Sequence, residues 1–588
     1  MVGVSIAEGT RLSLLLVRRG LRNAAGRLRG HPLLRWNILP SKADRLVIAP
    51  QDLRTADGTR ASEIYAGRFA FAGKVVICDG RSPFELIPPS DEWATSLLTF
   101  GWLRHLRAAE SGITRANARA LVDEWIALHG GWHPIAWRPD VLARRITAWF
   151  THAPLILHDA DDRFYRRFLR SLARQVRYLR HTAMEAPDGV ARLQAIIALT
   201  YAALCMAGQT RHLRGTANHL VMEVERQILP DGGHLSRNPG ALIELLLDFL
   251  PLRQAFAARN VAPPSALNNA IDRMMPMLRF FRHADGNFAL FNGMGPTALD
   301  LIATILAYDD ARGAAPTNAP YSGYQRIETK NLLILMDTGC PPPFGMSQEA
   351  HAGCLSFELS SQQQRIVVNC GLPVVNRETW RQVTRATAAH STVVFNDTSS
   401  CRFLETGTFK RLIGTPIVSG PTHVPIAREE LNDAIVLRAS HDGYANRYYM
   451  VHQRALMLAA DGNRLDGEDL FVPTSDSKKH LSANDEFAVR FHLHPMVKAN
   501  RLTDGKGVML MLANKEVWTF DAYENQVEIE ESVYLAGPDG PRRTAQIVIY
   551  GHARVVERVH WSFTHVTPAG TAPRRDRGDE PELPLTTP

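Results

Sequence analysis

The spacing of apolar residues changes once along the chain, near residue 315. Between about residues 93 and 311, apolar positions recur three and four residues apart, as in ALVDEWIALH and ARLQAIIALTYAALCM. This is the period of amphipathic α-helices. Gly, Pro and Asp interrupt these segments at short intervals. The pattern predicts successive antiparallel helical hairpins.

After residue 315 the apolar residues alternate with polar ones or form short runs between turn residues, as in NLLILMDTG, STVVFND and AQIVIYG. Roughly ten such segments follow one another without long helices between them, which predicts an antiparallel β-sandwich. Ahead of the helical part, RFAFAGKVVIC also has the pattern of strands. The fold class is therefore predicted to be α+β and multidomain.

These patterns divide the chain into four parts. Residues 1–92 are expected to hold a basic helix and a small strand-containing region, and residues 93–315 the helical domain. The β-sandwich is expected over residues 316–567. Residues 568–588 are rich in proline and charge, which predicts a disordered tail.

Composition narrows the partners only in part. The 588 residues carry a net charge of +8, with 67 basic against 59 acidic side chains. Arginine greatly outnumbers lysine, which favours bidentate contacts to carboxylate, sulfate or phosphate. No zinc-knuckle, helix-turn-helix or RNP-like pattern supports nucleic acid as the partner. An anionic polysaccharide is equally compatible with this charge, and composition alone does not choose the partner.

The N-terminal stretch RLSLLLVRRGLRNAAGRLRG predicts a basic amphipathic helix. Such a helix packs on its own domain or lies on an anionic membrane surface, and both alternatives stay open. No apolar run approaches the roughly 18 residues of a transmembrane span, and no usual secretory signal is visible. The compartment stays open between the cytoplasm and the periplasm or cell envelope, and so does the formation of a homodimer.

Six cysteines are scattered without a CxxC pair, mostly in apolar runs, so we expect buried free thiols. Cys354 and Cys370 fall on neighbouring predicted strands, where a disulfide is the alternative.

A histidine precedes each of two predicted strands, in HAGCLSFELS (351–360) and in TRATAAHSTVV (384–394). A sheet that buries one face and lines the other with His, Arg, Glu and Asn suits an anionic, hydroxyl-rich ligand. Arg381 and Arg385 are four residues apart and could clamp a carboxylate. The alternative for them is a solvated face or an internal ion pair.

These two segments, in this order, resemble the heparinase II/III-like family. The helical half adds EWATSLLTFGWLRHLR, WRPDVLARRITAW and ILPDGGHLSRNP, which resemble the family's Trp-rich helices and its Asp-Gly turn. The matching positions of the second half are His351, Leu355, Ser356, Phe357, Gly371, Arg385, Thr387, Ala389, His390 and Thr392. The resemblance covers most of the chain. It implies an incomplete (α/α) toroid of helical hairpins followed by an antiparallel β-sandwich, with the ligand in the cleft between them.

Characterised members of that family are lyases that cleave uronate polymers by β-elimination. The resemblance thus implies a polysaccharide lyase acting on an acidic polysaccharide. Such a reaction needs a base for the proton alpha to the carboxylate, a group that neutralises the carboxylate, and an acid for the leaving oxygen. The alternative is a glycan-binding or non-lyase protein of an envelope or exopolysaccharide system that has lost the usual catalytic residues.

The resemblance and the local motifs together nominate site residues. The expected catalytic residues are His351, His390, His234 and Tyr444. The expected substrate-binding residues are Arg381, Arg385, Arg237, Asn238 and His441. In metal-bearing relatives the positions of His351, His390 and Asn369 hold zinc, so zinc or calcium is the cofactor that the resemblance suggests. For His234 the alternative is a helix-capping turn, for Tyr444 a core position, and for the two sandwich histidines a hydrogen-bonded pair that organises the cleft floor.

The sequence also departs from the family pattern at positions that matter for catalysis. Ala241 stands where active relatives carry a tyrosine, and Ala191 and Arg192 stand where they carry an Asn-Asn-His start to a helix. Gly353 and Asn369 replace two aspartates, and Glu349 replaces the first histidine of a His-x-His pair. Either other residues supply the proton transfers, or this branch binds glycans without cleaving them.

Overall fold

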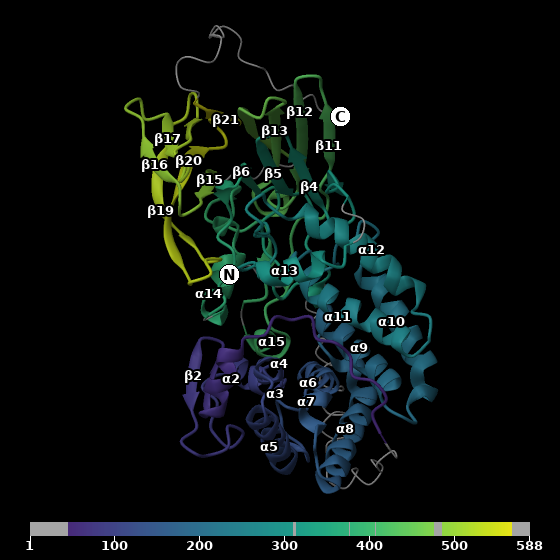
Figure 1. The fold of residues 1–588 in the computed structure, drawn as a ribbon. Coiled ribbons are helices and arrows are strands. Elements are labelled where there is room, and N and C mark those ends of the chain that lie inside the picture. Colours follow the sequence, from purple (N-terminus) through teal and green to yellow (C-terminus); the bar gives the residue numbers. More distant parts are fainter. Residues whose placement is uncertain (1–44, 310–312, 376, 406, 475–484, 567–588) are drawn as a thin grey trace.

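The computed structural model describes residues 45–566, apart from 310–312, 376, 406 and 475–484. The predicted basic helix near the N-terminus and the predicted tail lie outside the described residues. Figure 1 shows a helical half and a half built of strands, in the order that the sequence predicts. Within the described ranges, no helix is long and apolar enough to cross a membrane.

Helices of the first half pair into hairpins around an incomplete ring. They are α2 (Gly58–Tyr65), α3 (Asp91–Leu98), α4 (Leu103–Ala109), α5 (Gly112–His129), α6 (Pro139–Thr151), α7 (Ala153–Leu157), α8 (Asp162–Thr182), α9 (Val190–Cys205), α10 (Leu213–Gln227), α11 (Gly240–Ala258), α12 (Ser265–Phe280) and α13 (Leu299–Leu306). Helices α6, α9 and α11 pack side by side and are buried over most of their length. Helix α9 is apolar almost throughout, as expected for an interior helix, whereas α8 carries an arginine-rich outer face.

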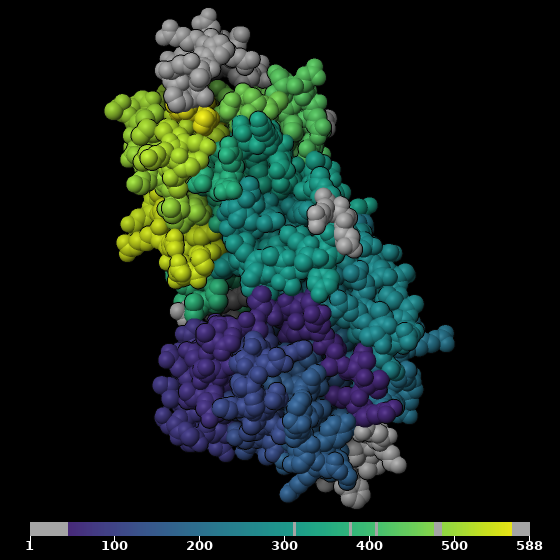
Figure 2. All heavy atoms as spheres, in the orientation of Figure 1, coloured from purple at the N-terminus to yellow at the C-terminus, as the bar shows by residue number. Residues whose placement is uncertain are grey.

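The segment before α2 joins the two open ends of the ring. Leu46 bridges to Met206 at the end of α9. Further on, the Thr55 hydroxyl donates to Asp300 of the last helix, α13, at 2.5 Å. The backbone of Asp57 donates to His105 of α4 at 3.0 Å. Figure 2 shows this N-terminal part, in purple, lying across the blue helical residues, with teal and green parts of the chain above it. The predicted strands of this region form the hairpin β1 (Arg68–Phe71) and β2 (Lys74–Ile77).

Strands of the second half form two antiparallel sheets that face each other. One has the order β11-β12-β13-β14-β21-β18-β17-β16, and the other the order β19-β20-β15-β7-β6-β5-β4-β3 with β8 paired to β15. Their bounds are β3 (Asn318–Ala319), β4 (Tyr324–Glu328), β5 (Leu332–Asp337), β6 (Phe357–Ser361), β7 (Gln364–Val368), β8 (Val393–Phe395), β11 (Ile426–Glu430), β12 (Ala434–His441), β13 (Met450–Ala459), β14 (Arg464–Pro473), β15 (Glu486–Leu493), β16 (Lys498–Arg501), β17 (Gly507–Met511), β18 (Val517–Asp521), β19 (Glu528–Tyr534), β20 (Arg542–His552) and β21 (Arg558–His565). A small sheet pairs β9 (Arg402–Phe403) with β10 (Ile417–Ser419), and short helices α14 (Arg377–Arg385), α15 (Gly407–Ile413) and α16 (Ala445–Tyr448) complete this half.

Buried aromatic rings fill the space between the two sheets. Phe357 stacks on Trp561 with ring centroids 5.6 Å apart, and Phe491 meets the same tryptophan edge-on at 4.8 Å. Burial of such rings is the main favourable term for this core. All six cysteines are free thiols and five of them are buried, as predicted, so Cys354 and Cys370 are not joined.

Arg237 fastens the helical ring to the sandwich. This buried side chain follows α10 and pairs with Asp337 at the end of β5, with 2.5 Å between Nη2 and Oδ1. It also donates to the carbonyls of Ser322, Gly323, Gly339 and Cys340. The prediction that Arg237 binds substrate is therefore wrong, because its guanidinium is committed to the protein's own oxygens.

Candidate active site

The structure brings His351 and His390 into direct contact. His351 lies in the loop after the short helix Phe344–Met346, and His390 follows α14 and the turn Thr387–Ala389. The Nδ1 atom of His351 is 2.9 Å from the Nε2 atom of His390, and the rings meet edge to face. The exposed fraction is 5% for His351 and 1% for His390. Both rings are buried, and so is the Nε2 atom of His351.

Hydrogen bonds fix the tautomer of this pair. The Nδ1 atom of His390 is 2.8 Å from the carbonyl of Ala386, which can only accept, so this nitrogen carries a proton. Burial lowers the pKa of His390 to about 4, so the ring is neutral near pH 7 and its Nε2 atom accepts. The Nδ1–H of His351 then donates to it. In its neutral form, His351 therefore has its lone pair on Nε2, the atom that can take up a proton.

Arg385 holds the loop that carries His351. Its side chain is fully buried and donates to the carbonyls of Ser347, Ala350 and Thr415 at 2.7–2.8 Å. Its guanidinium also lies over the ring of Phe403. The expectation that Arg385 clamps a substrate carboxylate is wrong, because its donors face backbone oxygens of the loops it joins. Its role is to position His351.

A second chain of contacts reaches His351 from the toroid side. The backbone N–H of His351 donates to Asn292 at 3.2 Å, and the Asn292 amide donates to Asp337 at 3.0 Å. Asn292 has the left-handed φ of 47° that asparagine tolerates before glycine. Sequence reasoning missed Asn292 and Asp337, although the Asn-Gly pair in FNGMG was a signal for such a turn.

Gly353 allows the close approach of His390. A Cβ atom at position 353 would lie 2.8 Å from Cδ2 of His390. The absence of a side chain at position 353 therefore leaves room for the imidazole in its present place.

Asn369, inside the sandwich, holds the segment that directly follows His390. Its Oδ1 atom accepts the backbone N–H of Ser391 at 3.0 Å, and the side chain is fully buried. The residues predicted to hold zinc or calcium do not fit such an ion here. The facing nitrogens of the two histidines are bonded to each other, and the amide oxygen of Asn369 is occupied by a backbone donor. Among the described residues there is no group of three or more His, Cys, Asp or Glu side chains that could hold a metal.

His234 does not join the pair. Its Nδ1 atom accepts the backbone N–H of Ser236 at 3.1 Å, so its Nε2–H donates to Gln227 at 2.9 Å. Burial, and then the charge of Arg226, lowers its pKa to about 4. The prediction of His234 as base is wrong, and the alternative of a capping turn after α10 is the one that the contacts support.

Asn238 and Arg381 lie at the edge of the site. The Asn238 oxygen caps the start of α11 by accepting from Gly240 at 2.8 Å. A Cβ atom on Gly293 would meet both the Asn238 amide and Glu349, which places those two side chains close together. Arg381 approaches Glu349 from α14, with 3.5 Å between Nη1 and Oε1. For both residues a role in substrate binding stays a prediction.

Tyr444 and His441 belong to the interior of the sandwich. The Tyr444 hydroxyl donates to the carbonyl of Val393 at 2.8 Å, and burial raises its pKa. His441 is 1% exposed and hydrogen-bonded to His452. Neither side chain reaches the His351–His390 pair, so the predicted roles of Tyr444 as acid and His441 as substrate ligand are corrected to structural ones.

A buried ion pair joins the two histidine loops from behind. Arg454 makes two hydrogen bonds to Asp469, at 2.8 and 3.0 Å. Its Nη1 atom also donates to the carbonyls of Leu355 and Ser391, both at 2.9 Å. Leu355 lies beyond His351, and Ser391 directly follows His390. Arg454 therefore fixes the separation of the two loops.

Comparison with known proteins adds three findings. Residues 311–562 match the model of the family described as "Heparinase II/III-like, C-terminal". The chain is 31% identical over 539 residues to a protein of Caulobacter vibrioides named FtsZ-localized protein C, covering 90% of this chain and 92% of that one. Solved structures with the same fold include heparan sulfate lyase HepC from Pedobacter heparinus in a mutant form (16% identity, TM-score 0.62, 97% and 92% covered) and heparinase III (13% identity, TM-score 0.68, 94% and 91% covered).

Proposed function

The chain belongs to the heparinase II/III-like family, and from this premise we propose that it cleaves an acidic, uronate-containing polysaccharide by β-elimination where toroid and sandwich meet. One observation carries the proposal: the oriented His351–His390 pair, in which neutral His351 would have its lone pair on Nε2. Such a ring, held by a second histidine, has the geometry of a general base.

In the proposed reaction, Nε2 of His351 takes the proton from C5, alpha to the uronate carboxylate. The electrons of that C–H bond form the C4–C5 double bond, and the C4–O4 bond breaks. Ala241 cannot protonate the leaving oxygen, so O4 takes its proton from the imidazolium of His351 or from water. Asn238 and Arg381, at the edge of the site, are the proposed partners of the carboxylate.

The test measures the new double bond directly. Purified protein is incubated with heparan, chondroitin, hyaluronan, alginate and bacterial exopolysaccharides, and the ultraviolet absorbance of the unsaturated uronate is followed. We expect absorbance to rise with at least one polymer and the rise to vanish in His351→Gln. The matched control is His423→Gln, the same exchange at an exposed histidine of the sandwich. Full activity in the folded His351→Gln protein would refute the assignment.

A second function is favoured by two observations taken together. The similarity to FtsZ-localized protein C extends over most of both chains, and Ala241 and Arg192 replace the toroid-side groups that a lyase of this family uses. We propose as the alternative a protein that binds glycan without cleaving it and is recruited to FtsZ. Co-sedimentation with FtsZ polymers, together with glycan binding and no absorbance rise, would select this alternative over the lyase.

A further inference from the structure

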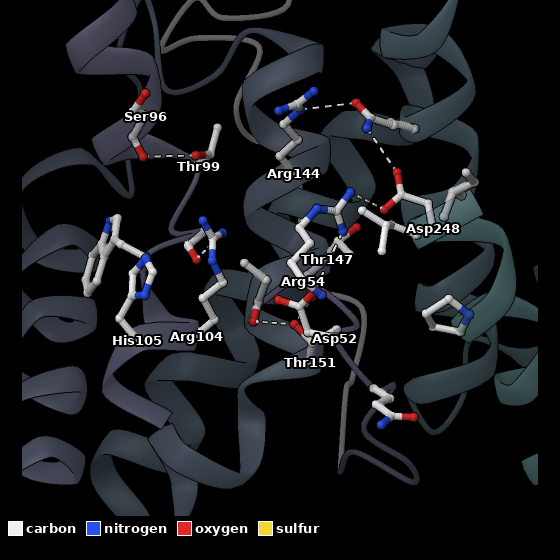
Figure 3. Close-up of a pocket in the computed structure, with 18 of the residues that line it drawn as sticks. Asp52, Arg54, Ser96, Thr99, Arg104, His105, Arg144, Thr147, Thr151 and Asp248 are labelled. Carbon is white, nitrogen blue, oxygen red and sulfur yellow. Dashed lines mark hydrogen bonds and ion pairs between the residues drawn. The ribbon is translucent and has the colours of Figure 1, made fainter. Parts of the chain in front are cut away.

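A cavity lies inside the helical ring, apart from the histidine pair. Its volume is about 290 Å³, and its walls come from α6, α9 and α11, from the segment Thr99–His105 and from residues 51–54. Figure 3 shows Arg104 and His105 on one side of this space and Arg54, Asp52 and Asp248 on the other. No residue of the two histidine loops lines it. The cavity is therefore a site of its own.

Positive charge exceeds negative charge in the lining. Four arginines line the cavity (Arg54, Arg60, Arg104 and Arg144) against two aspartates, Asp52 and Asp248. Both aspartates are taken up by Arg54, whose guanidinium lies 2.8 Å from Asp248 and 3.8 Å from Asp52. Burial alone would raise the pKa of Asp52, but His152 and Arg54 lower it to about 2, so this carboxylate stays charged. The side chains that line the cavity therefore carry a net positive charge.

Arg104 is the lining arginine whose charge is not compensated by an ion pair among the described residues. Its Nη1 atom donates to the carbonyl of Gly101 at 2.9 Å, and its buried Nε atom has no hydrogen-bond partner among the described residues. None of the ion pairs between described residues includes Arg104, and burial lowers its pKa. The next cation, Arg60, is exposed and lies 3.9 Å from Asp57. Keeping an unpaired cation partly out of water costs free energy, which an anionic ligand group would recover.

We propose that this cavity binds a small, hydroxyl-bearing anion, with its carboxylate, sulfate or phosphate group on Arg104. The volume is at the lower end of ordinary ligand sites, about 300–1,000 Å³, so the ligand is of the size of a monosaccharide or disaccharide. Ser96, Thr99 and Thr147 bring hydroxyl groups to the lining, and Trp102 and Phe71 provide an apolar wall. The proposal does not depend on catalysis at His351.

The experiment is isothermal titration calorimetry on the full chain. The probes are glucuronate, glucose 6-sulfate, glucose 6-phosphate and inorganic phosphate, with glucose as the neutral reference. We expect saturable binding of at least one sugar anion, with glucose binding at least tenfold more weakly and added salt weakening the anion. The sugar anion that binds most tightly identifies whether the site prefers a carboxylate, a sulfate or a phosphate group. If inorganic phosphate binds as tightly as the sugar anions, the proposal that the ligand is a sugar is refuted.

Two variants locate the binding. Arg104→Gln keeps a polar side chain and removes the charge, and we expect affinity to fall about tenfold or more, as for the loss of a charged hydrogen bond. Arg163→Gln makes the same exchange at an exposed arginine of α8, outside the lining, and should bind as the unmodified chain does.

Two further measurements separate ligand binding at Arg104 from a structural role and from the lyase proposal. The melting temperature of ligand-free Arg104→Gln should equal or exceed that of the unmodified chain, because an unpaired charge has been removed. Unchanged anion affinity in Arg104→Gln, or a lower melting temperature, would overturn the proposal and make Arg104 a structural residue. His351→Gln should retain anion binding, so failure of the lyase proposal leaves this one standing, and the reverse also holds.

Discussion

Replacing Arg454 by methionine tests how the two histidine loops are held together. Arg454 and Asp469 are both fully buried and joined by two hydrogen bonds. Burial alone would raise the pKa of Asp469, but Arg454, and then His452, lower it below its usual value. Methionine fills similar space but removes the positive charge. Asp469 is then a buried charge whose remaining side-chain donors, among the residues that the structure describes, are His452 and Trp561.

Breaking one partner of a buried ion pair typically costs about 3–5 kcal/mol. We expect Arg454→Met to lower the free energy of unfolding by that amount, measured by urea titration of Trp fluorescence at pH 7. The double variant Arg454→Met/Asp469→Asn should recover part of the loss, because the buried charge is then gone. The control is Arg464→Met, whose partner Asp466 lies at 2.7 Å but whose side chain is 39% exposed. That pair should be worth less than about 1 kcal/mol.

The same variant should disturb the histidine pair at a distance. Arg454 donates to the carbonyls of Leu355 and Ser391, so its loss frees both loops to move. We expect the imidazole nitrogen signals of His351 and His390 to broaden in the NMR spectrum of Arg454→Met and to be unchanged in Arg464→Met. A loss below about 1 kcal/mol in Arg454→Met, or no recovery in the double variant, would refute the account of Arg454 as the tie between the loops.

Two further predictions concern pH and packing. The pKa values of His234 and His390 are lowered to about 4 and that of His492 to about 3, against about 6.5 in an unfolded chain. Between pH 6.5 and 5 the unfolded chain therefore binds more protons than the folded chain. As the pH falls through this range, each of these histidines should lower the free energy of unfolding by up to about 1.4 kcal/mol per pH unit. Equal urea midpoints at pH 7 and 5 would contradict this. Gly353→Asp places a side chain against His390 and should cost about 1–3 kcal/mol, seen as a lower melting temperature. Gly58→Asp, with no atom within 4 Å of the new Cβ, should change little.

The sequence was sufficient for the large elements. A helical period gives way to an alternating one near residue 315, and the structure changes from helices to antiparallel strands at the same point. The helix α9 and the strand β15 follow directly from their apolar patterns. The hydrogen bond between His351 and His390 was predicted only as one of two alternatives, because the two residues are far apart in the sequence.

Only the tertiary structure decided what the polar residues do. Arg237, Arg385, His234 and Tyr444 have the side chains that an active site uses, and the sequence gives no sign that backbone carbonyls and buried amides satisfy them. In the same way, Arg104 lies in an ordinary helix pattern, yet the fold leaves its Nε atom buried without a partner among the described residues. The physical reason is that apolar periodicity records which face of an element is buried, whereas the function of a polar group depends on the atoms that surround it. Those atoms come from loops and helices far along the chain, and only folding brings them together.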